Sequence, residues 1–267
     1  MTYFDALFLG ILQGLTEFLP VSSSGHLVLF ESILGLEFNE STLKGFDVVL
    51  HFGTLLAIII YFKNDLINLF KGVEKSLKTK KLDKESTLFR NLLIATIPAL
   101  FVGFFFNDLL DELFRNVKSV GIMLGLTGLV LILSEKFPQK KQSREINLKE
   151  SILIGIAQSI ALIPGISRSG STISTAMFQG ISRDEAARFA FLMAIPAISA
   201  ATGYILLKAL LGKIVFPEIG LLLTGFIASL ISSYLCVKFL MHFIRKHSLS
   251  IFSYYLFIAS LVLIFWQ

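Results

Sequence analysis

The chain has 267 residues, of which 54% are hydrophobic and only 16% charged, and its mean hydropathy is +0.76. These values exclude an ordinary soluble domain and predict an all-α polytopic membrane protein. The net charge of +5 would suggest nucleic-acid binding in a soluble protein. Here the basic residues gather in particular loops, so we expect no nucleic-acid partner.

The predicted elements alternate between interrupted and continuous apolar stretches. Residues 4–35 are apolar but are broken near Pro20, which favours a re-entrant helical hairpin over a straight span. A second broken stretch at 150–182 predicts a second hairpin. Continuous stretches of membrane-spanning length follow each hairpin, giving six predicted transmembrane helices at 45–62, 88–106, 118–134, 187–207, 217–240 and 250–266.

The two broken stretches carry a duplicated segment. Residues 8–27 align without a gap with residues 153–172, an offset of 145, so that Ser22 falls on Ser167 and Gly25 on Gly170. Polar repeats with Pro and Gly breaks inside apolar surroundings are typical of a binding site at a repeat interface.

Basic loops predict the orientation. Fifteen of the 24 Lys and Arg residues lie at 63–85, 135–149 and 238–249, whereas 31–44 and 106–117 are acidic. The positive-inside rule places the three basic loops in the cytoplasm and both termini outside. The first hairpin then enters the membrane from outside and the second from the cytoplasm. We therefore expect two inverted repeats, 1–147 and 148–267, within one integral membrane domain.

The first hairpin contains the polar groups Gln13, Glu17 and His26, together with a serine run. Glu17 in an apolar stretch indicates a divalent-metal ligand or a base, or else an interfacial carboxylate, and Gln13 one helical turn earlier could supply a neutral oxygen ligand. His26 could take a proton from a serine or attack phosphorus itself. The backbone N–H groups and hydroxyls after Pro20 predict an anion site or a helix cap, formed by Ser22, Ser23, Ser24 and Gly25.

The second hairpin repeats this design with a guanidinium. Arg168 suits phosphate oxygens, and at this depth it needs either a ligand anion or Glu17 as partner. A pair with Glu17 that only pins the hairpins together is the structural alternative. The hydroxyls and the glycine around Arg168 favour phosphate binding, and they belong to Ser167, Ser169, Gly170, Ser171 and Thr172.

Three further features have simpler interpretations. Asp47 and His51 share a helical face and could support the site, although Asp47 also suits a solvated helix start. Ser182 and Glu185 have the spacing of a capping box. Cys236 is the only cysteine and is expected to be buried.

The pattern from Gln13 and Glu17 into Pro20–His26, together with Pro164–Thr172, resembles the undecaprenyl-diphosphate phosphatase family, also called the bacitracin-resistance family. The resemblance covers nearly the whole chain. It implies hydrolysis of undecaprenyl diphosphate to undecaprenyl phosphate and inorganic phosphate, in a bacterial plasma membrane, with the active site on the extracytoplasmic side. It also implies bacitracin resistance and a divalent cation, Mg²⁺ or Ca²⁺, as cofactor. Some members have Glu where this chain has Gln13, and the neutral side chain weakens any mechanism with two carboxylates on the metal.

Carried over residue by residue, the resemblance makes Ser23 the favoured nucleophile, with His26 assisting proton transfer. Glu17 would bind the cation with Gln13 or act as base, and Arg168 would clamp the diphosphate. The sequence does not decide between Ser23, His26 and water as nucleophile. Phosphate-binding groups would come from Gln13, Ser22, Ser24, Gly25, Ser167, Ser169, Gly170 and Thr172.

Two other functions remain open. Inverted repeats with broken helices also occur in transporters, so the chain could translocate a polyprenyl phosphate or another anion, and a lipid-phosphate receptor would bind without turnover. The neighbouring Ser23 and His26 favour hydrolysis, because a transporter needs no nucleophile beside a base. The expected partners are the polyprenyl diphosphate and membrane lipids, and a homodimer is left open.

Overall fold

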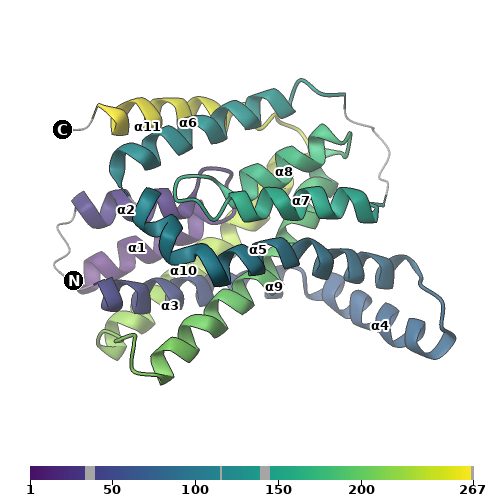
Figure 1. The fold of residues 1–267 in the computed structure, drawn as a ribbon, viewed down its shortest axis with the longest axis horizontal. Helices are drawn as coiled ribbons and strands as arrows, with labels where there is room; N and C mark the ends of the chain where they lie inside the picture. The colour runs from purple at the N-terminus through teal and green to yellow at the C-terminus, as the bar shows by residue number, and fades with distance from the viewer. Residues whose placement is uncertain (34–39, 115, 139–144, 266–267) are drawn as a thin grey trace.

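The computed structural model describes residues 1–33, 40–114, 116–138 and 145–265. Every regular element in these ranges is an α-helix, which confirms the predicted all-α class (Figure 1). In chain order the helices are α1 (Tyr3–Thr16), α2 (Ser23–Ile33), α3 (Glu40–Tyr61), α4 (Lys63–Thr79), α5 (Lys84–Phe114), α6 (Val117–Ser134), α7 (Leu148–Ile160), α8 (Arg168–Phe178), α9 (Arg183–Leu210), α10 (Ile219–Phe243) and α11 (Ser250–Ile264).

Five of the described helices are long and apolar enough to cross a membrane, so the chain is a polytopic membrane protein. These spans are Ser41–Tyr61, Lys84–Phe106, Val117–Ser134, Arg183–Leu210 and Ile219–Phe243. The sixth predicted span, 250–266, corresponds to α11, which has 15 helical residues. At 1.5 Å per residue α11 is about 22 Å long, less than the hydrocarbon core of about 30 Å. It packs along α6.

The predicted loop at 63–85 is wrong over most of its length, because residues 63–79 form helix α4. Leu66 and Leu69 fall on one helical face, and Leu69 is buried against the core. A Cβ at Gly72 would lie 2.5 Å from Glu85 Cβ, so the glycine allows α4 to approach α5 closely. The pair formed by α4 and the start of α5 projects from the bundle (Figure 1). Helix α5 also continues to residue 114, so most of the predicted loop at 106–117 is helical.

Each broken stretch forms a helical hairpin, α1–α2 and α7–α8, and the two hairpins open toward opposite ends of the bundle (Figure 1). At the open end of the first, Tyr3 Oη donates to Glu218 Oε1 at 3.3 Å, beside the start of α10. At the open end of the second, Asn91 Nδ2 donates to the Ile146 carbonyl oxygen at 2.8 Å. The two turns therefore meet inside the bundle.

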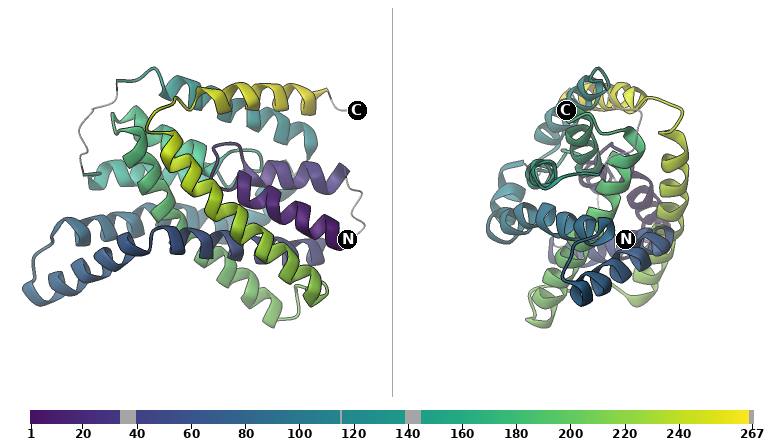
Figure 2. Two further views of the ribbon diagram at one scale, coloured as in Figure 1. Left: turned by 180° about the vertical axis from the view of Figure 1, so that it is seen from behind. Right: turned by 90° about the vertical axis from the view of Figure 1, so that its right-hand side faces the viewer.

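The basic segments gather at one end of the molecule. Helix α4, the start of α5, the end of α6 and the start of α7 lie at this end, while α1 begins and α11 ends at the other (Figures 1 and 2). Arg183 at the start of α9 pairs with Glu135 after α6, and Arg188 Nε lies 2.8 Å from Asp65 Oδ1 in α4. The predicted capping box at Ser182 is wrong: the Ser182 side chain makes no capping hydrogen bond.

The two helices that carry the start of the duplicated segment each pack closely against one long helix. Helix α1 packs against α10, and its counterpart α7 packs against α5. Both contacts are made at duplicated glycines. A Cβ at Gly10 would lie 2.5 Å from Gly225 O, and a Cβ at Gly155 would overlap the Ala95 backbone. Neither position has room for a side chain, so the helix backbones touch.

Candidate functional site

The turns of the two hairpins contact each other. A Cβ on Gly25 would lie 3.3 Å from Gly165 Cα, and Ser169 Oγ donates to the Leu19 carbonyl oxygen at 2.9 Å. The Arg168 guanidinium forms an ion pair with Glu17 across the same junction. The polar residues of both motifs are thus brought into one site.

The first turn is shaped by its serines. Helix α1 ends at residue 16, and α2 starts at residue 23. Between them Ser22 has a left-handed backbone conformation with φ 71°, which is uncommon for a residue other than glycine. Its Oγ accepts the Gly25 N–H at 3.3 Å and lies 3.4 Å from Ser24 Oγ. The serine therefore caps the second arm of the hairpin.

The second turn repeats these bonds 145 residues later. Ser167 Oγ accepts the Gly170 N–H at 3.1 Å and lies 3.1 Å from Ser169 Oγ. Gly165 has φ +92°, and a Cβ there would lie 2.7 Å from the Val120 carbonyl oxygen, so only glycine fits. Ser167 N–H donates to Thr127 Oγ1 of α6 at 3.2 Å, which holds the turn in place.

Glu17 is the centre of the site. Its side chain is 1% exposed and accepts hydrogen bonds from Gln13 Nε2 at 2.9 Å and Ser23 Oγ at 2.6 Å, in addition to the Arg168 pair. His51 Nε2 lies 3.7 Å from Glu17 Oε2. These donors compensate the cost of burying a carboxylate. Because Ser23 Oγ donates to it, Glu17 can accept the hydroxyl proton of Ser23.

His26 occupies a different place from the one predicted. Its Nδ1 lies 2.7 Å from the Ser22 carbonyl oxygen, and its Nε2 lies 2.5 Å from Tyr255 Oη in α11. The carbonyl can only accept, so Nδ1 carries the proton and Nε2 accepts from Tyr255. A hydrogen bond between His26 and Ser23, the arrangement expected from their closeness in sequence, is not among the contacts of the described residues.

The remaining predicted residues divide by accessibility. Ser23 is half-buried, Ser24 is exposed, and the Arg168 side chain is 23% exposed. These three can meet a ligand. Thr172 is buried, and its hydroxyl donates to the Arg168 carbonyl oxygen at 2.8 Å within its own helix. Its single hydroxyl proton is therefore used within the helix, and Thr172 has none left to donate to a phosphate oxygen.

A divalent cation beside Glu17 would need further oxygen ligands. No cluster of three or more His, Cys, Asp or Glu side chains suited to a metal occurs in the described part of the chain. Gln13 Oε1, however, is buried without a hydrogen-bond partner beside the Glu17 carboxylate. One carboxylate and one amide oxygen suit Mg²⁺ or Ca²⁺, which take oxygen ligands and complete their shells with substrate phosphates. The residues present therefore fit the expected cation.

Two residues of the site were not singled out from the sequence, Tyr255 and Thr127. Tyr255 is 229 residues from His26, and Thr127 is 40 residues from Ser167. Both lie in apolar helices, and a hydroxyl there is the only signal that the sequence offers. His51 was expected as support and contacts Glu17 directly.

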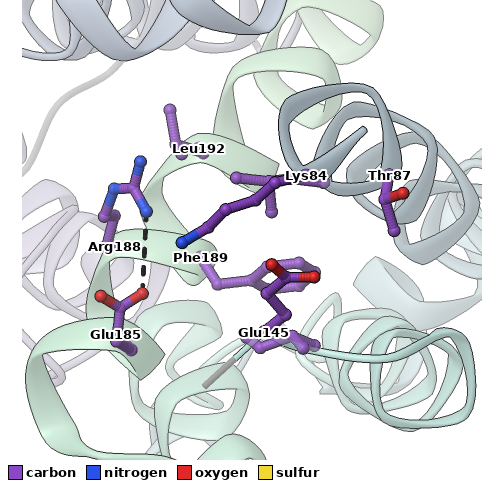
Figure 3. A pocket seen from close by; sticks show the side chains of 9 residues that line it. Lys84, Thr87, Glu145, Glu185, Arg188, Phe189 and Leu192 are labelled. Atoms are coloured by element: carbon purple, nitrogen blue, oxygen red, sulfur yellow. Dashed lines mark ion pairs between the residues drawn. The ribbon is translucent and has the colours of Figure 1, made fainter. Parts of the chain in front are cut away.

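A hollow elsewhere in the molecule does not share this chemistry. It lies between α5 and α9 at the basic end and is lined by Lys84, Glu145, Glu185 and Arg188, among others (Figure 3). Glu185 and Arg188 form an ion pair at 3.7 Å there. Acidic and basic groups balance in this hollow, so it has no preference for a diphosphate.

Comparisons with known proteins agree with the motif. The family model described as bacitracin resistance protein BacA matches residues 6–262. A protein of Halothermothrix orenii is 41% identical over 99% of this chain and 98% of its own length. A protein of Aliivibrio salmonicida is 39% identical over 100% of this chain and 98% of its own length. A protein of Methanosphaera stadtmanae is 40% identical over 97% of this chain and 96% of its own length. All three carry the name undecaprenyl-diphosphatase.

Proposed function

This chain belongs to the family of the bacitracin resistance protein BacA, and on that premise we propose that it is an undecaprenyl-diphosphatase. It hydrolyses undecaprenyl diphosphate to undecaprenyl phosphate and inorganic phosphate. The lipid carrier is thereby recycled for cell-wall synthesis, and sensitivity to bacitracin falls. Full-length identity of about 40% to three proteins of that name supports the activity.

The observation that carries the mechanism is the contact of Glu17 with both Ser23 and Arg168. Ser23 Oγ attacks the terminal phosphorus of the diphosphate while Glu17 accepts its proton. The bridging P–O bond breaks and undecaprenyl phosphate leaves. Water then hydrolyses the phosphoserine, which releases inorganic phosphate and restores Ser23. Glu17 thus takes the role of proton acceptor that the sequence suggested for His26, and His26 positions the turn beside Ser23 through its bond to the Ser22 carbonyl oxygen.

Arg168 binds the phosphate oxygens of the substrate. In the described structure its partner is Glu17, because an unpaired guanidinium at this depth is costly. When the diphosphate enters, it replaces Glu17 as the partner of Arg168. The planar fork of guanidinium donors then holds the phosphate oxygens and stabilises the charge of the transition state. The hydroxyl of Ser24 and the N-terminus of α8 complete the phosphate cradle.

Glu17 and Gln13 would hold a Mg²⁺ or Ca²⁺ ion, with the orphaned Gln13 Oε1 supplying the neutral oxygen. The cation would supply charge neutralisation at the phosphate oxygens.

The proposed location is the plasma membrane of a bacterium, with the site facing outward. The basic residues at one end of the bundle support a cytoplasmic position for that end. The first hairpin, with its exposed Ser24, opens to the other end. The matched packing of Gly10 and Gly155 supports two inverted repeats, 1–147 and 148–267.

Phosphate release tests the proposal. Purified protein in detergent with Mg²⁺ or Ca²⁺ should release inorganic phosphate from undecaprenyl diphosphate. Glu17→Gln should lower kcat at least about 100-fold, because it removes the proton acceptor. Glu150→Gln is the matched control. Glu150 belongs to the capping box at the start of α7, away from the hairpin turns, and Gln can replace Glu at that position of a capping box.

The same assay separates hydrolysis from transport, which the opposed hairpins would also suit. Binding of the lipid by wild-type protein without phosphate release above a chelated sample would exclude hydrolysis and favour the transporter.

A further inference from the structure

A groove with both apolar and basic walls lies away from the hairpin turns, at the C-terminal ends of α3 and α10. Its volume is about 510 Å³, and its lining includes Tyr61, Leu235, Phe239 and the cationic or imidazole side chains of Lys238, His242 and Arg245. We propose that this groove binds the phosphate headgroup of an anionic glycerophospholipid from the surrounding leaflet. The proposal is independent of the catalytic activity.

The lining has the polarity of a lipid. Leu235 and Phe239 are 58% and 56% exposed and lie within the span Ile219–Phe243. Arg245 follows two residues after that span ends. Arg245 lies just past the end of α10 at Phe243, whereas Leu235 lies within the helix, so the wall changes from apolar to cationic toward the C-terminal end of α10. Acyl chains and a headgroup require this order.

The basic side chains converge on one stripe. Lys238, His242 and Arg245 are spaced four and three residues apart, which places them on one face of the helix. Tyr61 comes from the end of another span and adds a hydroxyl at the same level. Basic pockets between membrane helices on the cytoplasmic side are typical sites for phosphate headgroups.

The groove also lacks a competing acid. No ion pair of Lys238, His242 or Arg245 occurs within the described ranges, whereas Lys75 and Lys78 on α4 pair with acidic residues. The nearby Asp65 lies 2.8 Å from Arg188 Nε and is already compensated. The positive-inside rule explains why basic residues lie at this end. It does not explain the groove between them or its apolar wall.

Native mass spectrometry of the detergent-purified protein tests the site. Wild-type protein should bind phosphatidylglycerol more tightly than phosphatidylcholine. The double variant Lys238→Gln/Arg245→Gln should bind phosphatidylglycerol about thirtyfold more weakly, because each cation near a lipid headgroup contributes about fivefold. The matched control is Lys71→Gln/Lys81→Gln, which makes the same charge change at exposed positions and should bind as wild type does.

Equal binding of the two lipids, an unchanged double variant or an equal loss in the control would overturn the proposal. Displacement of the lipid by millimolar inorganic phosphate would assign the groove to a free anion instead. A photoactivatable phosphatidylglycerol on wild-type protein gives a second readout that needs no variant. It should label peptides containing Tyr61 and Leu235–Arg245, and labelling only elsewhere would contradict the site.

Discussion

At the scale of single residues, the site depends on which donors reach which acceptors. Glu17 has contacts with Gln13, Ser23 and Arg168, and so joins residues from both hairpins. Removing one member of a buried ion pair leaves an uncompensated charge, at a cost of about 3–5 kcal/mol. Loss of activity in a Glu17 or Arg168 variant should therefore be interpreted together with its stability.

Tyr255 offers a residue-scale prediction free of that difficulty. Tyr255→Phe removes only the hydroxyl that donates to His26 Nε2 and should lower kcat about tenfold through loss of one hydrogen bond. Phosphate release measures the effect. Tyr254→Phe is the control, because Tyr254 is 59% exposed one residue earlier. An unchanged Tyr255→Phe enzyme would exclude His26 orientation as a requirement.

At the scale of helices, close backbone contact places the hairpins. Gly10→Ala adds a Cβ that would lie 2.5 Å from Gly225 O and 2.8 Å from Ala228 Cβ, so α1 and α10 must separate. Overpacking of this kind costs about 1–3 kcal/mol. We expect a lower apparent Tm in detergent. Gly203→Ala in α9 meets no atom within 4 Å and should leave the Tm unchanged or raise it.

A second prediction at this scale concerns the junction of α6, α9 and α11. Glu135 accepts the Leu249 N–H at 2.8 Å and bonds from Arg183 Nε at 2.9 and 3.0 Å. Burial raises the pKa of the Glu135 carboxyl, but the hydrogen bonds from Arg183 and Leu249 lower it by more, so its pKa lies below the ordinary value.

A carboxyl whose pKa is lowered in the folded state stabilises the fold above its unfolded pKa of about 4.3. That stabilisation is lost as the pH falls through the lower folded pKa. Glu135→Gln should therefore cost about 2 kcal/mol at pH 7, and the Tm difference from wild type should shrink at pH 3. A difference that stays constant between these pH values would show that the charge of Glu135 contributes nothing.

At the scale of the whole molecule, the basic end and the opposite end, where α1 begins and α11 ends, make the orientation testable. Lys78→Cys should be protected from a membrane-impermeant maleimide in intact cells, whereas Lys213→Cys, exposed at the opposite end, should react. Cys236 is 3% exposed, so the native cysteine should add no background. Labelling at position 78 but not 213 would reverse the orientation.

The sequence by itself determined the helical membrane class, the two broken stretches and the residues that meet at their turns. Apolar runs of about 20 residues indicate helices that lie in a membrane. A duplicated polar segment within such runs indicates a polar site to which both copies contribute. The contact of Glu17 with Arg168 agrees with that pattern.

Only the tertiary structure decided which groups bond within the site. Ser23 and His26 are three residues apart, yet the former donates to Glu17 and the latter accepts from Tyr255, because helix direction aims them at different neighbours. The helix at 63–79 also escaped the hydropathy pattern, since packing against α5 stabilises it, and α11 is shorter than the apolar stretch 250–266 predicted. Hydropathy indicates whether a segment is surrounded by lipid or water. The pairing of Ser167 with Thr127, 40 residues away, and of His26 with Tyr255, 229 residues away, depends on tertiary packing.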